Sequence, residues 1–338
     1  MSRGVRKTFW SVFSALLVVA LLAGAGLAYL NRQHISDHFA AQSFDAPQEV
    51  LDLADRLDLT DEGRRVFLAT RPTLEASQRF NEQCADVDHS EGGHILGCYT
   101  RDSIHLFEVT DERIDGIVEV TAAHELLHAT FARLERGERD DLAARLNELY
   151  AELSGESPAL AERMSVYSAL SGDGFANELH SVLGTEVREL PDWLEQHYAR
   201  WFNDRDAIVD FFDDYHEIFD EIQTRAEELQ TEMEELREDV EERSAAYEEA
   251  VERFNDQVDD FNRRNAAFEF SGNEVEFWEL RERLERRSEE LGNEYERIQR
   301  RIEKYEEMRE ELQDLDAVNQ ELNEKLDSQL APPVGPSG

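Results

Sequence analysis

The chain has 338 residues, 41% of them hydrophobic, and a formal net charge of −42. This length and hydrophobic content allow one ordinary globular domain plus an extended part, and they exclude a wholly disordered protein. The negative charge excludes nucleic acid as an expected partner, because phosphate binding requires a basic face.

The first element along the chain is an apolar segment. Residues 9–30 carry no charged side chain, and a helix of that length crosses about 30 Å of hydrocarbon. Three basic residues lie in the preceding residues 1–8, so the positive-inside rule puts the N-terminus in the cytoplasm and the rest of the chain outside it. We therefore expect a single-pass protein of the cell membrane. A cleaved signal peptide is the alternative, since small residues at 23–26 could serve as a cleavage site.

The region after the anchor predicts a mainly helical domain with a little β structure. Residues 31–46 read as a polar connector and 47–215 as the folded domain, in which 95–99 and 103–109 are β-prone and form an expected hairpin. The helices expected from apolar periodicity lie at about 48–82, with a break at 60–63, and at 115–136, 138–153, 157–170, 174–183 and 191–215.

Cys84 and Cys98 are the two cysteines of the chain. Outside the cytoplasm they are expected to form a disulfide. Closing a loop of that length is worth roughly 3 kcal/mol in the chain-entropy model.

The C-terminal third has a heptad repeat, which predicts long coiled-coil helices over residues 216–330. Two arms separated by Phe270-Ser271-Gly272-Asn273 most simply fold back as an antiparallel hairpin, and pairing between chains is the alternative. Residues 331–338 read as a disordered tail. The repeat positions are Ala226, Met233, Val240, Tyr247, Phe254, Phe261 and Phe268 in the first arm, and Leu284, Leu291, Ile298, Tyr305, Leu312, Asn319 and Leu326 in the second.

The chemistry centres on His124-Glu125-Leu126-Leu127-His128, which matches the HExxH pattern. Residues four apart share one face of a helix, so His124 and His128 can bind one metal ion while Glu125 sits beside it. A zinc ion at such a site activates a water for attack on a carbonyl, and Glu125 would act as general base. The pattern predicts hydrolysis of a peptide bond.

With this motif on an amphipathic helix after a β-prone segment, the chain resembles the zincin metallopeptidases. The resemblance covers about residues 93–186 and implies an edge strand before the HExxH helix that pairs with an extended substrate. Downstream, Asn177-Glu178 resembles the third-ligand segment of the gluzincin branch, which makes Glu178 the expected third zinc ligand. His180 and Glu186 are the alternatives. The branch often has an Asp four residues after the ligand Glu, but here Val182 stands at that place.

Four further residues are weaker candidates for a role in the chemistry. His89 and His94 could bind a second metal ion, although an exposed loop is the simpler interpretation. His197 and Tyr198 could donate a hydrogen bond to an oxyanion, but helical residues at this spacing are more often core.

The sequence thus predicts a membrane-anchored, extracytoplasmic zinc metallopeptidase acting on a protein or peptide substrate, with a coiled coil that recruits a protein partner. The alternative is a non-catalytic envelope scaffold that works through the coiled coil, with a structural or vestigial metal site.

Overall fold

The computed structural model describes residues 31–85 and 94–329, with six further residues between 21 and 29. Most of the expected anchor at 9–30 lies outside the described residues. Within the described part of the chain, no helix is both long and apolar enough to cross a bilayer.

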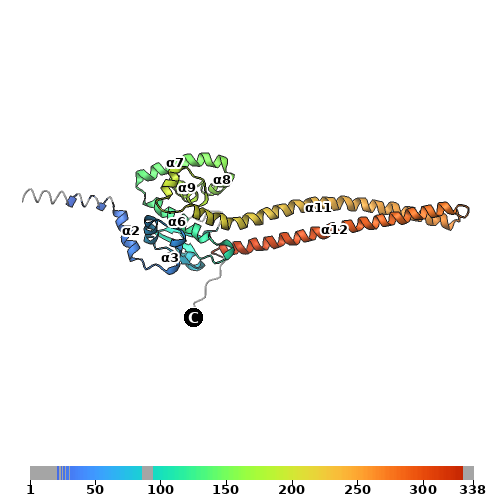
Figure 1. Ribbon diagram of the computed structural model, residues 1–338, viewed down its shortest axis with the longest axis horizontal. Helices are drawn as coiled ribbons and strands as arrows, with labels where there is room; N and C mark the ends of the chain where they lie inside the picture. The colour runs from blue at the N-terminus through green and yellow to red at the C-terminus, as the bar shows by residue number, and fades with distance from the viewer. Residues whose placement is uncertain are drawn as a thin grey trace, which may run out of the picture. The chain divides into compact units, whose positions relative to one another are not determined.

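The chain divides into two compact units. One unit runs to Ile218 and resumes at Leu322, and the other comprises Phe219–Glu321. The first unit is mainly helical with a small sheet, which confirms the mainly α (α+β) class predicted from the sequence (Figure 1). Its elements are α2 (Arg32–Ser43), α3 (Gln48–Arg56), α4 (Asp61–Ala69), β1 (Thr73–Glu75), α5 (Ser77–Gln83), β2 (Gly97–Thr100), β3 (Ser103–Phe107), the 3-10 turn η1 (Glu112–Ile114), α6 (Ile117–Arg133), α7 (Arg136–Glu156), α8 (Pro158–Ser165), α9 (Gly172–Glu186), α10 (Asp192–Tyr198) and the first turns of α11 (Asp206–Ala266).

The sheet has three strands in the order β1-β3-β2, with β1 parallel and β2 antiparallel to β3. The predicted β-hairpin is therefore confirmed. Its turn residues Arg101 and Asp102 have φ values of 51° and 64°, as the right-handed strand twist requires in a two-residue turn. Strands β1 and β2 are the two edges of this sheet, and β3 is central. An edge strand before the HExxH helix is therefore present, namely β2, with β3 following it in sequence before α6.

Helix α6 is central in this unit, where it packs against α9, α4, β2 and β3. Alternation along β3 turns Ile104 and Leu106 into the main core. Phe107 faces the other side and packs with Cys84 and Cys98 in a smaller cluster. These cysteines form the predicted disulfide, which ties the end of α5 to the edge strand.

Close packing of α9 on α6 depends on a glycine. A Cβ atom at Gly184 would lie 2.3 Å from Leu127 Cδ1 and 2.9 Å from Tyr198 Cε1, so a larger residue would push the two helices apart. This contact sets the distance between the HExxH helix and the segment that carries Glu178.

Three segments differ from the prediction. Residues 48–82, expected to be helical apart from a break at 60–63, also contain the strand β1 between α4 and α5. The expected connector at 31–46 contains α2, in which the buried Asp37 pairs with Arg133 at 3.1 Å. The helix expected over 191–215 is interrupted between α10 and α11, because the backbone there pairs elsewhere: the Thr60 amide donates to the Trp201 carbonyl at 2.9 Å. Local periodicity does not reveal such a long-range pairing.

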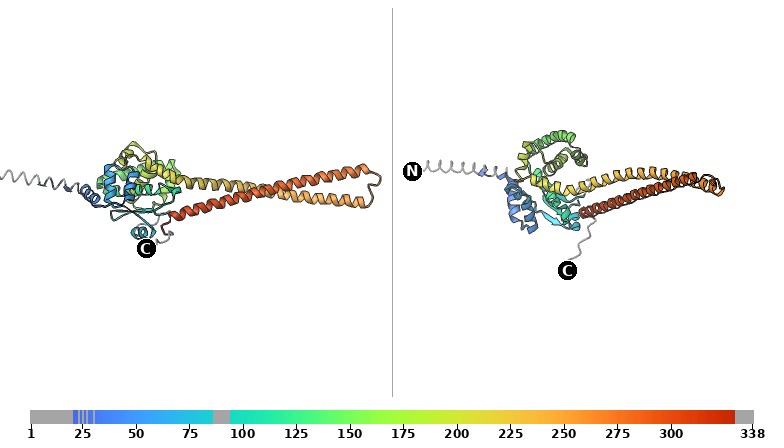
Figure 2. Two further views of the ribbon diagram at one scale, coloured as in Figure 1. Left: turned by 60° about the horizontal axis from the view of Figure 1, so that its bottom comes forward. Right: turned by 45° about the vertical axis from the view of Figure 1, so that its right-hand side comes forward.

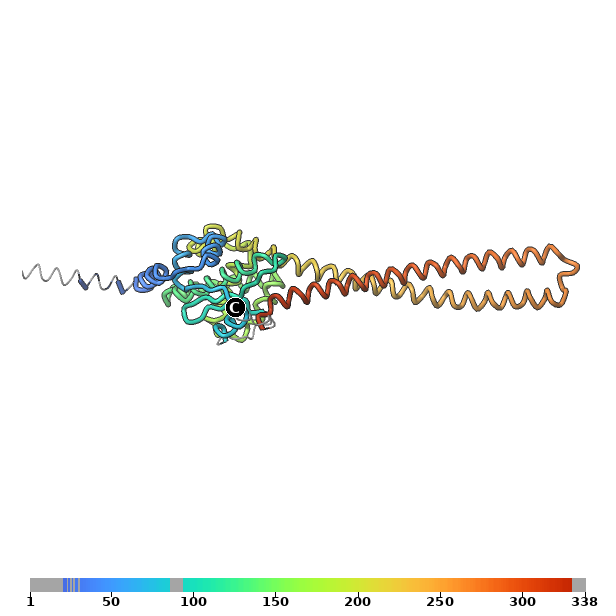
Figure 3. The backbone as a smooth tube through the Cα atoms, turned by 90° about the horizontal axis from the view of Figure 1, so that it is seen from below, coloured from blue at the N-terminus to red at the C-terminus, as the bar shows by residue number. Residues whose placement is uncertain are grey.

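The second unit is built from the long parts of α11 and α12 (Glu274–Leu326), which lie side by side in all views (Figures 2 and 3). They run antiparallel, since Arg225 pairs with Glu311 and Arg243 pairs with Glu294. The predicted helical hairpin is confirmed. Phe268, expected in its seam, lies instead beyond the end of α11, where it has a φ of 58° and is 81% exposed.

Candidate metal centre

The HExxH segment occupies the middle of α6, as predicted. His124, Glu125 and His128 present ligand atoms within 4.8 Å of one another, and this group can hold a metal ion. The two imidazole rings stand nearly perpendicular, with centroids 4.7 Å apart. Their placement follows from helix geometry, because residues four apart lie one above the other.

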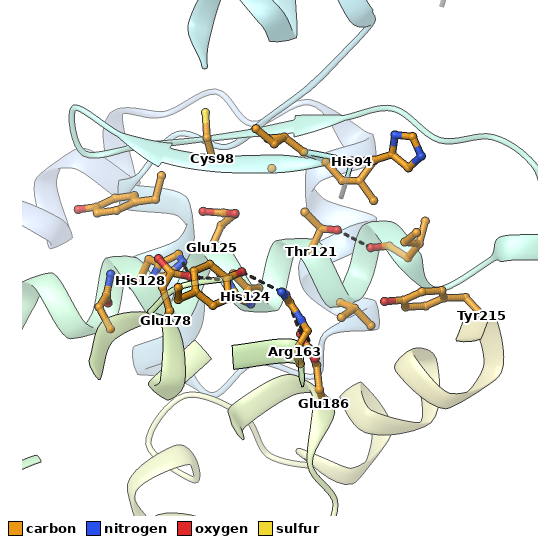
Figure 4. A pocket seen from close by; sticks show the side chains of 18 residues that line it. His94, Cys98, Thr121, His124, Glu125, His128, Arg163, Glu178, Glu186 and Tyr215 are labelled. Carbon is orange, nitrogen blue, oxygen red and sulfur yellow. Dashed lines mark hydrogen bonds and ion pairs between the residues drawn. The ribbon is translucent and has the colours of Figure 1, made fainter. Parts of the chain in front are cut away.

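Helix α9 brings Glu178 to the same point. Glu178 Oε2 lies 3.6 Å from His124 Nε2 and 3.5 Å from His128 Nε2, and Figure 4 shows the three side chains converging. This oxygen is buried and has no hydrogen-bond partner among the described residues. Buried polar atoms are almost always satisfied, so an unsatisfied carboxylate oxygen facing two imidazole nitrogens indicates a site for a bound cation.

The electrostatics of the three groups favour positive charge between them. Burial lowers the pKa of His128, but the carboxylate of Glu178 outweighs it and raises that pKa to about 9. Burial would raise the pKa of Glu178, yet the adjacent imidazoles hold it well below its ordinary range. The pKa of His124 is lowered, chiefly by burial. A proton or a metal cation can occupy the space between them.

Ser181 supports His128 from behind. Its Oγ lies 3.2 Å from His128 Nδ1, and both groups are buried. A hydrogen bond at the second ring nitrogen fixes the orientation of a ligand imidazole. Ser181 was not predicted from the sequence, which showed only that Val182 stands where the gluzincin branch often has an Asp. Ser181 was detectable in principle, because it lies three residues after Glu178 on the same face of α9.

A cleft with a cavity volume of about 280 Å³ opens beside these residues. One wall is the edge strand β2, which carries Cys98 (Figure 4). Gly97 in this strand lies against Glu125, because a Cβ atom at Gly97 would be 2.9 Å from Glu125 Cγ. On the other side, Arg163 of α8 forms a two-point ion pair with Glu186 at 3.1 to 3.2 Å. Neither Gly97 nor Arg163 belongs to a sequence motif that would identify it as part of the site.

The other predicted candidates have partners elsewhere. His180 is fully buried, and its Nε2 lies 2.9 Å from His197 Nε2. The Glu186 carboxylate forms an ion pair with Arg163. Tyr198 is a core residue, and its hydroxyl donates to the His180 carbonyl at 2.7 Å.

The second metal ion considered at His89 and His94 stays untested, because only one of these two histidines is described. His89 lies outside the described residues, and His94 lies 3.2 Å from Asn323 Oδ1.

The chain matches no family model, no curated protein and no solved structure. Any functional conclusion must therefore come from the site itself.

Proposed function

We propose that this protein is a zinc-dependent metallopeptidase that hydrolyses peptide bonds, with His124, His128 and Glu178 as zinc ligands and Glu125 as general base. The observation that carries the proposal is the convergence of two Nε2 atoms and one buried carboxylate oxygen at 3.5 to 3.6 Å. This set resembles the gluzincin branch of the zincins in its donor types and in the helices that carry them.

The distances fit the proposed metal. Tetrahedral zinc with ligand bonds of about 2.0 to 2.2 Å separates its ligand atoms by roughly 3.4 Å, close to the separations of 3.5 and 3.6 Å at Glu178 Oε2. Two imidazoles with one carboxylate suit zinc better than magnesium or calcium, which prefer oxygen ligands. Three protein ligands are typical of catalytic zinc sites.

When bound, zinc would supply Lewis-acid chemistry that acidifies a water and polarises a carbonyl. Glu125 lies in the same helix turn as both imidazoles and lines the cleft. Its carboxylate can accept the proton of the attacking water and pass it to the leaving amine. Ser181 holds His128 in orientation while this occurs.

The cleft suits an extended peptide. Among the residues that the structure describes, strand β2 pairs only with β3, so its other edge can form backbone hydrogen bonds with a substrate strand. Because Gly97, Cys98 and Tyr99 of β2 line the cleft, such a strand would pass beside Glu125. The substrate-binding edge strand expected before the HExxH helix is therefore β2 in this proposal.

The test is zinc stoichiometry by elemental mass spectrometry together with hydrolysis of a peptide library. We expect about one zinc per chain, lost in His124→Ala, and retained in Glu125→Gln with hydrolysis abolished. Absence of zinc from the wild type would refute the metal assignment. Full hydrolysis by Glu125→Gln would refute the general base.

We also propose that residues 9–30 anchor the chain in the membrane, with the catalytic unit outside the cytoplasm. The Cys84–Cys98 disulfide supports this placement, because disulfides persist in oxidising compartments. Membrane fractionation of cells, with protease added from outside, tests it. Protection of the catalytic unit from that protease would contradict the orientation.

The helical hairpin is the basis for the proposed protein partner. Replacing Phe219–Glu321 with a short loop should spare hydrolysis of small peptides and reduce action on a natural protein substrate. The scaffold alternative draws on the same hairpin and predicts zinc binding without hydrolysis of any peptide.

A further inference from the structure

A second cavity adjoins the metal cleft. It has a volume of about 520 Å³ and shares four lining residues with the cleft: His94, Arg163, Glu186 and Tyr215. Its remaining walls come from α8, the end of α9 and the first turns of α11. The two cavities are therefore contiguous, and both belong to the unit that ends at Ile218.

Apolar and aromatic side chains form much of this second cavity. Leu160 and Val166 contribute from α8 and the residue after it, and Phe212 contributes from α11. The Phe212 ring stacks on His216 one turn later, with centroids 5.0 Å apart and planes 16° apart. Such a wall suits an apolar or aromatic side chain, which gains from burial and from ring stacking.

Arg163 stands at the junction of the two cavities. Its Nε and NH2 groups donate to Glu186 and its NH1 group donates to the Tyr167 hydroxyl at 3.0 Å. These bonds use three of the five N–H groups of a guanidinium, and the other two have no acceptor among the described residues. In Figure 4 the side chain extends toward the His124 side of the cleft.

The pairing of Arg163 determines what it can recognise. The Glu186 side chain is 10% exposed and neutralises the Arg163 guanidinium, whose side chain is 39% exposed. A neutral pair with fixed, unused donors suits a neutral acceptor such as a peptide carbonyl, and offers little net charge to a terminal carboxylate.

We propose that the second cavity is a substrate subsite that takes an apolar or aromatic side chain from an internal segment of a peptide, with Arg163 donating to a backbone carbonyl between the two cavities. This inference rests on the proposed function and adds a substrate class to it. It also gives the first turns of α11 a direct role in substrate recognition, before the helix continues into the hairpin.

Binding measurements test the subsite without turnover. The full chain carrying Glu125→Gln is titrated against fluorescein-labelled peptides with blocked ends, in which one Phe is moved through an Ala and Ser background. At one position or two adjacent positions, Phe should tighten binding about tenfold over the reference peptide. Adding Phe212→Ala should abolish this preference, and Asp214→Ala, an exposed residue of the same helix outside the cavity, should preserve it.

Three results would overturn the subsite: equal affinity for all Phe positions, a Phe preference unchanged by Phe212→Ala, or equal loss of affinity for Phe and reference peptides in that variant. Binding strengthened more than tenfold by a free C-terminal carboxylate would overturn the assignment to internal segments. Arg163→Lys, with folding checked by circular dichroism, should weaken all peptides alike, since Arg163 contacts backbone.

Zinc content and hydrolysis, measured separately, distinguish the two proposals. A chain that binds zinc and cleaves peptides but shows no Phe preference keeps its function and loses the subsite. A chain that binds Phe peptides selectively without zinc keeps the subsite and loses the metallopeptidase assignment.

Discussion

Gly97 gives the sharpest prediction for the catalytic geometry. A Cβ atom at this position would lie 2.5 Å from Thr121 Cγ2, and 2.9 Å from both Cγ and Oε1 of Glu125. Thr121 cannot turn away without loss, because its hydroxyl donates to the Ile117 carbonyl at 2.7 Å. In Gly97→Ala, the side chain of Glu125 must therefore move, or strand β2 must move away from α6.

Either movement amounts to about 1 Å, the difference between these separations and ordinary contact. A misplacement of that size can cost about a hundredfold in rate, and overpacking costs about 1 to 3 kcal/mol of stability. We expect Gly97→Ala to retain zinc, to lose about a hundredfold in kcat/KM on a peptide substrate, and to unfold at lower urea concentration. Zinc content, initial rates and urea unfolding measure the three quantities.

The control is Gly137→Ala, whose added Cβ meets nothing within 4 Å and should leave all three quantities nearly unchanged. Adding Thr121→Ser to Gly97→Ala removes the 2.5 Å contact but keeps the two contacts with Glu125, so it should recover stability more than activity. Wild-type activity in Gly97→Ala would refute the reasoning, as would a loss of activity explained wholly by loss of zinc.

Three further predictions follow from supporting contacts. Ser181→Ala should weaken zinc binding about 10- to 100-fold in a chelator competition, because His128 loses the bond at its second nitrogen, whereas the exposed Ser165→Ala should not. Arg133→Met leaves the buried Asp37 without its ion-pair partner and, among the described residues, with only the Gln33 amide as a hydrogen-bond donor, and should cost about 3 kcal/mol in denaturant unfolding; adding Asp37→Leu should restore much of this. Burial, followed by two nearby arginines, lowers the pKa of His197 to about 4. The folded state therefore favours neutral His197 more than the unfolded state does. The stabilisation from this residue is full above about pH 6.5, the pKa in the unfolded chain, and is lost as the pH falls toward 4. A His197→Gln variant should show a shallower decline over that range, and an unchanged profile would contradict this assignment.

Most features predicted correctly from the sequence are set by local geometry. The HExxH pair depends only on the helical period, and the β2–β3 hairpin depends on two short β-prone runs. The helix pair depends on a seven-residue repeat. In each case the deciding residues lie within one or two turns of each other, so packing with distant segments does not change the outcome.

The features missed from the sequence depend on contacts between distant segments. Gly97 and Glu125 are 28 residues apart, and nothing local marks their contact. The break before α11 comes from backbone pairing with Thr60. Phe268 is seven residues after Phe261 and so fits the heptad repeat, but α11 ends before it and the chain turns there. Its side chain therefore does not pack between the two helices. A periodic pattern indicates which face is buried and does not indicate where the helix stops.

Zinc binding and folding should be coupled, because the proposed ligands come from two helices. His128 and Glu178 are 50 residues apart in sequence and meet only when α9 packs on α6 through Gly184. The unfolded chain therefore lacks the site, and free zinc at a hundred times its Kd should stabilise the native state by about 2.7 kcal/mol. Thermal unfolding should show a higher Tm with zinc than with chelator, and Glu178→Gln should lose most of that difference. Magnesium at the same concentration should have no effect. Equal Tm values with zinc and with chelator would mean that these three side chains do not bind the metal together.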